Sequence, residues 1–166
     1  MSDADTLATH GRCACGRIRF EVRGPPLIVH ACHCTWCRRE SGTAHALNGM
    51  WEADRVVHLA DEPEIVDTPS ASGKGQKIAR CPTCRVALWS NYAGSGPAAR
   101  FVRIGTLDEP ARFPPDIHIF TSTKLPWVTL PADARAVPEF YRPEDVWSAA
   151  SLERRRIMRA KAAGAG

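Results

Sequence analysis

The sequence predicts a mainly β protein, built of antiparallel sheets and ending in a C-terminal helix. Three observations support this fold class. Short segments in which apolar and charged residues alternate recur up to Phe120, as in half-buried strands. Thirteen prolines and twelve glycines divide the chain into segments too short for most helices. The exception is residues 144–161, where turn residues are few and arginines many, a composition that favours a helix.

The expected strands follow one another from Ile18 onwards. Ile18, Phe20 and Val22 alternate with charged residues, and Gly24 with the two prolines after it ends this strand. Residues 38–41 are expected to form one helical turn that Gly42 ends. Further strands are expected at residues 27–31, 43–51, 55–59, 65–66, 77–80, 85–90, 101–106 and 117–120. The resulting organisation is a flexible tail over 1–10, a cysteine-containing β domain over 11–142, and an arginine-rich helix and tail over 143–166.

Length and composition exclude several classes of protein. At 166 residues the chain is expected to form one domain with its own core. The sequence has no apolar run of the roughly 18 residues that a transmembrane helix needs, and its first ten residues lack the apolar region of a secretory signal. A cytoplasmic location is therefore expected, where structural disulfides are rare. The net charge of +4 comes largely from arginines near the C-terminus, so it is weak support for nucleic-acid binding.

Seven cysteines form three clusters with the spacing of metal ligands. An odd number of thiols cannot all pair as disulfides within one chain, and a cysteine that is only a small buried hydrophobe has no reason to lie in such a cluster. The clusters follow the patterns C-x-C, C-x-C-x-x-C and C-x-x-C, in that order: Cys13 and Cys15; Cys32, Cys34 and Cys37; Cys81 and Cys84.

These clusters are expected to divide into one closed and one open zinc site. The first and last clusters together supply four thiolates, which is a complete tetrahedral shell, whereas Cys32, Cys34 and Cys37 leave a fourth position open, as catalytic zinc sites do. An alternative division joins a member of the middle cluster to Cys81 and Cys84. Iron–sulfur ligation is a further possibility for thiolates, but its usual spacings are absent. The sequence thus predicts two zinc ions per chain, the second more labile.

The open site is expected to favour thiol chemistry over hydrolysis. Three thiolates and one Zn²⁺ carry a net charge of about −1, which makes the zinc a weaker acid toward water and favours a soft fourth ligand such as a thiol. A thiolate held in this way is a nucleophile at neutral pH.

The cysteine motifs resemble those of the glutathione-dependent formaldehyde-activating enzyme family, to which centromere protein V is related. The resemblance runs from about Gly11 to Leu130. It implies a zinc-pinned β-tent fold and a carbon–sulfur lyase or synthase that joins glutathione and formaldehyde as S-hydroxymethylglutathione, so its partners would be a small thiol and an aldehyde. By position it implies Cys13, Cys15, Cys81 and Cys84 as structural zinc ligands, and Cys32, Cys34 and Cys37 as the active-site ligands. The motifs that carry it are Cys13-Ala14-Cys15-Gly16, Cys32-His33-Cys34-Thr35-Trp36-Cys37-Arg38-Arg39, Cys81-Pro82-Thr83-Cys84, Pro115-Asp116-Ile117-His118-Ile119-Phe120 and Trp127.

Other polar residues near the clusters have two interpretations. His33 is expected to border the site rather than supply a fourth ligand, because adjacent side chains point apart in extended backbone. Arg38 and Arg39 would bind the carboxylates of a peptide-like thiol or form a solvated face. The arginine run 154–156 is expected to be a solvated helix face, with nucleic-acid contact as the alternative. A non-catalytic zinc-binding module for protein or nucleic acid therefore remains the second functional hypothesis.

Overall fold

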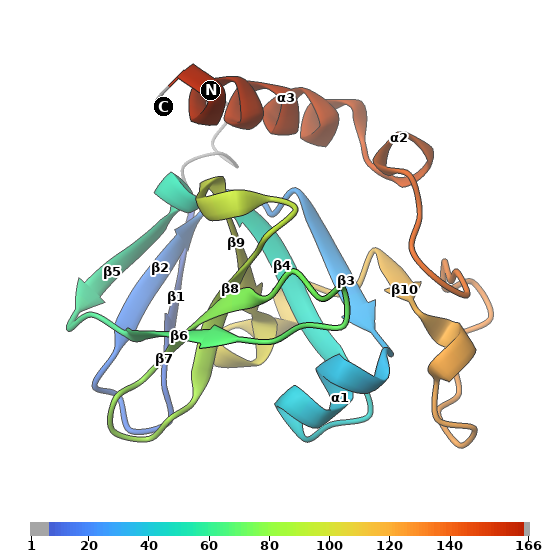
Figure 1. Cartoon of the computed structure of the whole chain (residues 1–166), viewed down its shortest axis with the longest axis horizontal. Coiled ribbons are helices and arrows are strands. Elements are labelled where there is room, and N and C mark those ends of the chain that lie inside the picture. The colour runs from blue at the N-terminus through green and yellow to red at the C-terminus, as the bar shows by residue number, and fades with distance from the viewer. Residues whose placement is uncertain (1–6, 165–166) are drawn as a thin grey trace.

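The computed structural model describes residues 7–164 and consists mainly of two β-sheets (Figure 1). The smaller sheet has the strand order β1-β2-β5, and the larger has the order β10-β3-β4-β9-β8-β7-β6. Helix α3 (Ala149–Gly164) crosses above the sheets in the view of Figure 1. The predicted mainly β class is confirmed. The strands are β1 (Ala8–Arg12), β2 (Arg19–Arg23), β3 (Ile28–Cys32), β4 (Ala46–Glu52), β5 (Val56–Ala60), β6 (Glu64–Thr68), β7 (Gln76–Arg80), β8 (Ala87–Tyr92), β9 (Ala99–Arg103) and β10 (Ile117–Ile119).

Alternating side chains make the core between the sheets. Phe20 and Val22 are fully buried while the arginines at both ends of β2 are exposed, as their alternation predicts. From the larger sheet, Trp51 and Val102 are buried against them in the same apolar cluster. This core holds the two sheets together next to the cysteine turns.

Strand direction departs from the prediction at one place. Every pair of named strands is antiparallel except β10 with β3, which run parallel. A hairpin forces an antiparallel return, but β3 and β10 are separated by a long stretch of chain, which allows a parallel arrangement. The larger sheet is therefore mixed rather than purely antiparallel.

The N-terminal tail is shorter than expected. Residues 8–10, predicted to be flexible, belong to β1, which pairs with β2 along its whole length. Thr9 is buried opposite Val22. The sequence does not predict this strand because its residues are small or polar. The strand forms by pairing with β2 rather than through an apolar pattern of its own. The rest of the predicted tail, residues 1–6, lies outside the described residues.

The C-terminal helical region is broken where one helix was expected. Helix α2 (Pro143–Val146) ends at Trp147, whose backbone is extended, and α3 then begins at Ala149. The hydroxyl of Ser148 accepts a hydrogen bond from the Ser151 backbone N–H at 3.1 Å, which is how an N-cap starts a new helix. No helix in the described part of the chain is long and apolar enough to cross a membrane.

Helix α3 packs over the short 3-10 turn η3 (Gly96–Ala98), beside the end of β4. Met158 is buried, whereas Ile157 is 41% exposed. The Arg154 guanidinium donates two hydrogen bonds to the Glu52 carboxylate, at 2.8 and 2.6 Å, and Arg155 lies over the Trp147 ring at 5.5 Å. The prediction of a solvated arginine face is therefore wrong for these two arginines, which dock the helix.

Candidate active site

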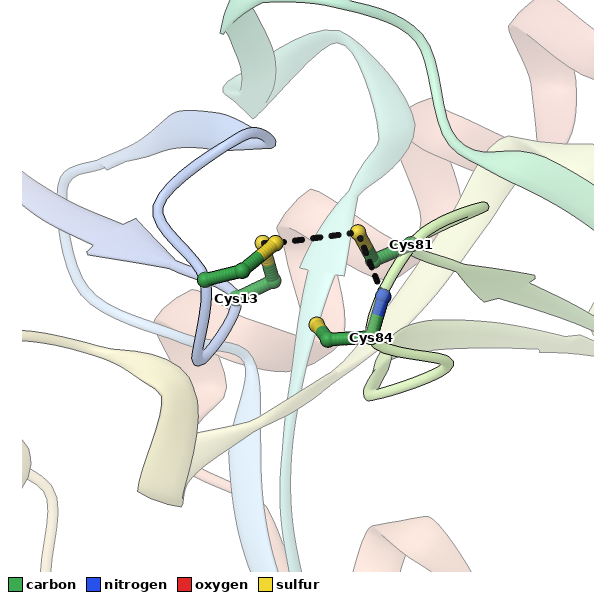
Figure 2. Close-up of side chains that lie close together, drawn as sticks. Cys13, Cys81 and Cys84 are labelled. Carbon is green, nitrogen blue, oxygen red and sulfur yellow. Dashed lines mark hydrogen bonds between the residues drawn. The ribbon is translucent and has the colours of Figure 1, made fainter.

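The first and last cysteine clusters meet in a group of four. Cys13 and Cys15 lie on the turn between β1 and β2, and Cys81 and Cys84 lie on the turn between β7 and β8. Figure 2 shows Cys13 beside Cys81 and Cys84. The four Sγ atoms lie within 4.8 Å of one another. This four-cysteine cluster therefore joins the smaller sheet to the larger one.

The geometry of the four-cysteine cluster fits a metal ion. Its Sγ atoms approach to 3.5 Å between Cys13 and Cys15 and to 3.6 Å between Cys15 and Cys81, close to the roughly 3.8 Å between two sulfurs of tetrahedral zinc with Zn–S bonds of about 2.3 Å. The Cys84 N–H donates to Cys81 Sγ at 3.5 Å (Figure 2). The backbone N–H of Val86, followed by contact with Cys15, lowers the pKa of Cys84 to about 6, which favours the thiolate that binds metal.

The middle cysteines form a separate group of three. Cys32 is the last residue of β3, Cys34 is the N-cap of helix α1 (Thr35–Ser41), and Cys37 lies within that helix. Their Sγ atoms lie within 4.8 Å of one another, and the Cys37 N–H donates to Cys34 Sγ at 3.3 Å. Gly42 ends α1 in the left-handed conformation with φ 66°, as predicted from its lack of a side chain. A strand end and one short helix thus suffice to bring three sulfurs together.

The electrostatics of this three-cysteine cluster favour a bound cation. Hydrogen bonds from the neighbouring sulfurs of Cys32 and Cys37 lower the pKa of Cys34 to about 2. The same contacts, with burial, raise the pKa of Cys32. One thiolate is therefore favoured and further negative charge is penalised, until a divalent ion compensates it. The cluster could bind a metal through three sulfurs.

Histidines near the three-cysteine cluster are paired with one another. His33 is fully buried, and its Nε2 lies 3.0 Å from Nδ1 of His118. The ring of His45 lies 4.9 Å from that of His33, centroid to centroid. Neither metal-binding group among the described residues includes a histidine. His33 thus borders the site, and the seven cysteines divide four and three in space, without the alternative mixing.

A buried ion-pair network flanks the three-cysteine cluster, which sequence analysis missed. Glu40 follows Cys37 by three residues in α1, and its carboxylate pairs with Arg80 and with Arg103, the latter at 3.3 Å. The Glu40 side chain is only 10% exposed. Two arginines and one glutamate carry a net charge of about +1, which offsets the charge of about −1 expected for three thiolates with a divalent ion. No short motif marks these residues, since they come from three separate elements.

The other basic residues of α1 differ in their surroundings. Arg38 Nη2 donates to Thr35 Oγ1 at 3.4 Å, and its Nε is buried without a partner among the described residues. Arg39 is exposed. A cleft of about 970 Å³ lies elsewhere, between Pro25, Phe113 and Arg135, and none of the seven cysteines lines it. The volume of this cleft therefore does not identify the candidate site. The site is identified by the chemistry of the clustered sulfurs.

One comparison with known proteins identifies a family for this chain. The family model described as glutathione-dependent formaldehyde-activating enzyme matches residues 8–123. No curated protein matches the chain. A solved structure of a Rhodobacter sphaeroides protein aligns with a TM-score of 0.46 and 21% identity, covering 60% of this chain and 87% of that one. The match over residues 8–123 includes all seven cysteines, and the chain belongs to the glutathione-dependent formaldehyde-activating enzyme family.

Proposed function

We propose that this chain is a zinc-dependent carbon–sulfur lyase or synthase. It would join a small thiol, glutathione or a relative, to formaldehyde or a similar aldehyde, or split the adduct in reverse. The observation that supports this most is the contrast between the clusters. One group has four sulfurs, enough to complete a tetrahedral metal shell. The other group has three sulfurs, and no fourth cysteine or histidine joins them among the described residues.

The residues that would hold the metals follow from this contrast. Cys13, Cys15, Cys81 and Cys84 would hold a structural zinc, and Cys32, Cys34 and Cys37 would hold the catalytic one. When bound, the catalytic zinc would keep an incoming thiol deprotonated at neutral pH.

The chain's own groups would prepare the site for this chemistry. The Cys37 N–H holds the Cys34 sulfur in place at 3.3 Å. The ion pairs of Glu40 with Arg80 and Arg103 fix α1 and would compensate the charge of the three thiolates and their zinc.

Two measurements test the proposal. Exchange NMR of glutathione with formaldehyde should show adduct formation faster in the presence of the protein than in buffer, and an equal rate would rule out this reaction. Mass spectrometry under non-denaturing conditions should find two zinc ions per chain. A Cys34→Ser variant should retain one ion and lose the acceleration.

The alternative of a nucleic-acid-binding module loses its main support in the structure. Arg154 is bound to Glu52, and Arg156 pairs with Glu153 at 2.7 Å. Arginines that are engaged within the chain offer fewer free charges to phosphates.

A further inference from the structure

Arg103 lies on the same sheet face as a cysteine of the three-cysteine cluster. Cys32 on β3 pairs with Ala46 on β4, and Asn48, two residues along β4, pairs with Arg103 on β9. Because directly paired residues and residues two apart share a face, the side chains of Cys32, Asn48 and Arg103 lie on one side of the sheet. The Arg103 guanidinium donates to Asn48 Oδ1 at 2.5 Å.

Tyr92 extends this face toward the next strand. Ser90 on β8 pairs with Phe101 on β9 and accepts a hydrogen bond from Arg103 at 2.9 Å. Tyr92, two residues beyond Ser90, packs edge-on against the Phe101 ring with centroids 4.9 Å apart. Arg103 and Tyr92 are therefore adjacent groups on one buried face.

Both groups lie on the side of the sheet that faces the three-cysteine cluster. Arg103 pairs with Glu40 at 3.3 Å, and Glu40 lies in the same helix as Cys37. Tyr92 shares the sheet face of Arg103 and Cys32. A phenol has an ordinary pKa of about 10, so such a hydroxyl keeps its proton at neutral pH and can donate it.

One hydrogen-bond donor of Arg103 is left over. Its two terminal nitrogens are engaged by Asn48, Glu40 and Ser90, whereas its Nε is buried without a partner among the described residues. Leaving a buried donor on a charged group unpaired destabilises the protein. A ligand oxygen placed there would remove that cost.

We infer that the Arg103 Nε–H and the Tyr92 hydroxyl bind the oxygen of the aldehyde substrate beside the three-cysteine cluster. This inference rests on the proposed function and names two catalytic residues for it. Paired donors aimed at an oxygen that gains negative charge are a principal means of catalysing addition to a carbonyl.

The addition step balances with these two residues. The substrate thiolate forms a bond to the aldehyde carbon, and the carbonyl π pair moves to the oxygen, where Arg103 stabilises the charge. Tyr92 gives its proton to that oxygen, which yields the hydroxymethyl thioether. The Tyr92 phenolate then takes the proton that the next thiol loses when it becomes a thiolate, so no other reactant is needed.

A kinetic experiment separates the two tyrosines of the chain. Tyr92→Phe should lower kcat about 100-fold and change KM for the thiol little. Tyr141→Phe is the matched control, because its hydroxyl instead contacts His30 and Trp147, and it should retain kcat. Equal kcat for Tyr92→Phe and wild type would overturn the inference.

A binding experiment tests the same groups without turnover. Formate serves as the probe, as a one-carbon oxyanion, and its binding to the zinc-loaded protein is followed by saturation-transfer NMR. Its Kd should rise about tenfold in Tyr92→Phe and in Arg103→Lys, which keeps the charge but loses Nε–H, and should stay unchanged in Tyr141→Phe. Absence of formate binding, or equal binding by all variants, would overturn the inference.

The two experiments distinguish this inference from the proposed function. Formate binding that depends on Tyr92 and Arg103, in a wild-type protein without thiol–aldehyde turnover, would retain the oxygen site and reject the reaction. Turnover that survives Tyr92→Phe would retain the reaction and reject the site.

Discussion

Replacing one cysteine in each cluster should produce two different losses of stability. Cys81→Ser removes a ligand from the four-cysteine cluster, and Cys34→Ser removes one from the three-cysteine cluster. Both substitutions keep a local hydrogen bond, because serine can accept from the same backbone N–H groups that now donate to Cys81 and Cys34. Serine is also a good N-cap for α1. The difference between the variants therefore reports the loss of metal rather than of local structure.

The expected magnitudes follow from the lengths of chain that each cluster closes. The Cys15–Cys81 contact spans 66 positions, for which the chain-entropy relation for a cross-link gives about 4 kcal/mol, whereas the stretch from Cys32 to Cys37 gives about 2 kcal/mol. Metal–ligand bonding adds to both, and a structural zinc site can provide roughly 10 kcal/mol or more. A loss of that size is comparable to the whole free energy of unfolding of a typical domain, about 5–15 kcal/mol. Cys81→Ser should therefore leave the chain largely unfolded, and Cys34→Ser should leave it folded.

Urea unfolding followed by tryptophan fluorescence measures this difference, since Trp51 and Trp89 are buried in the core between the sheets. The unfolding free energy of Cys34→Ser should exceed that of Cys81→Ser by at least about 2 kcal/mol. Equal destabilisation by the two variants would mean that both metals are structural. That result would refute the assignment of an open, catalytic site and favour the non-catalytic binding module.

Three further predictions concern the core, the pH dependence and the C-terminal helix. Gly49→Ala should destabilise the protein by about 2 kcal/mol or more in urea unfolding, because the new methyl would overlap a tryptophan ring, whereas Gly105→Ala, in open space, should cost much less. Burial lowers the pKa of His30 from 6.5 to about 4, so the unfolded chain binds more protons than the folded one between these pH values. The free energy of unfolding should therefore fall by about 3 kcal/mol as the pH drops from 6.5 to 4. In urea titrations at several pH values, His30→Gln should reduce this dependence on pH. Arg154→Ala should speed amide hydrogen exchange in α3 and cost about 1–3 kcal/mol, while Arg159→Ala, at an exposed position, should leave exchange unchanged; equal exchange in both variants would contradict the docking role of Arg154.

Local features of the sequence were the easiest to predict. The grouping of Cys32, Cys34 and Cys37 requires only a strand end and one helical turn, so spacing alone foretells that their sulfurs converge. Most strands were located to within a few residues, because apolar alternation reflects the burial of one face. β1 was missed because its residues carry no such pattern.

The division of the four cysteines into one group was predictable for a different reason. Two complementary pairs complete a tetrahedral shell, and the three remaining sulfurs cannot. The arrangement in space that brings the pairs together, with the β1–β2 turn against the β7–β8 turn, was not contained in any local pattern. Ligand number therefore predicted a long-range contact that secondary-structure patterns could not.

The residues beside the three-cysteine cluster show where such reasoning stops. Arg103 and Tyr92 share a sheet face with Cys32 only because β9 lies between β4 and β8 in the sheet, and strand order is a property of the whole fold. The Arg154–Glu52 pair joins residues 102 positions apart. The sequence does not predict it either, because a run of arginines predicts a solvent-exposed face. The proposed metal ligands converge in pairs or triplets of short spacing, whereas the groups proposed to bind a substrate oxygen are brought together by strand register. The sequence of a small metal-binding β protein should therefore reveal its metal chemistry before its substrate.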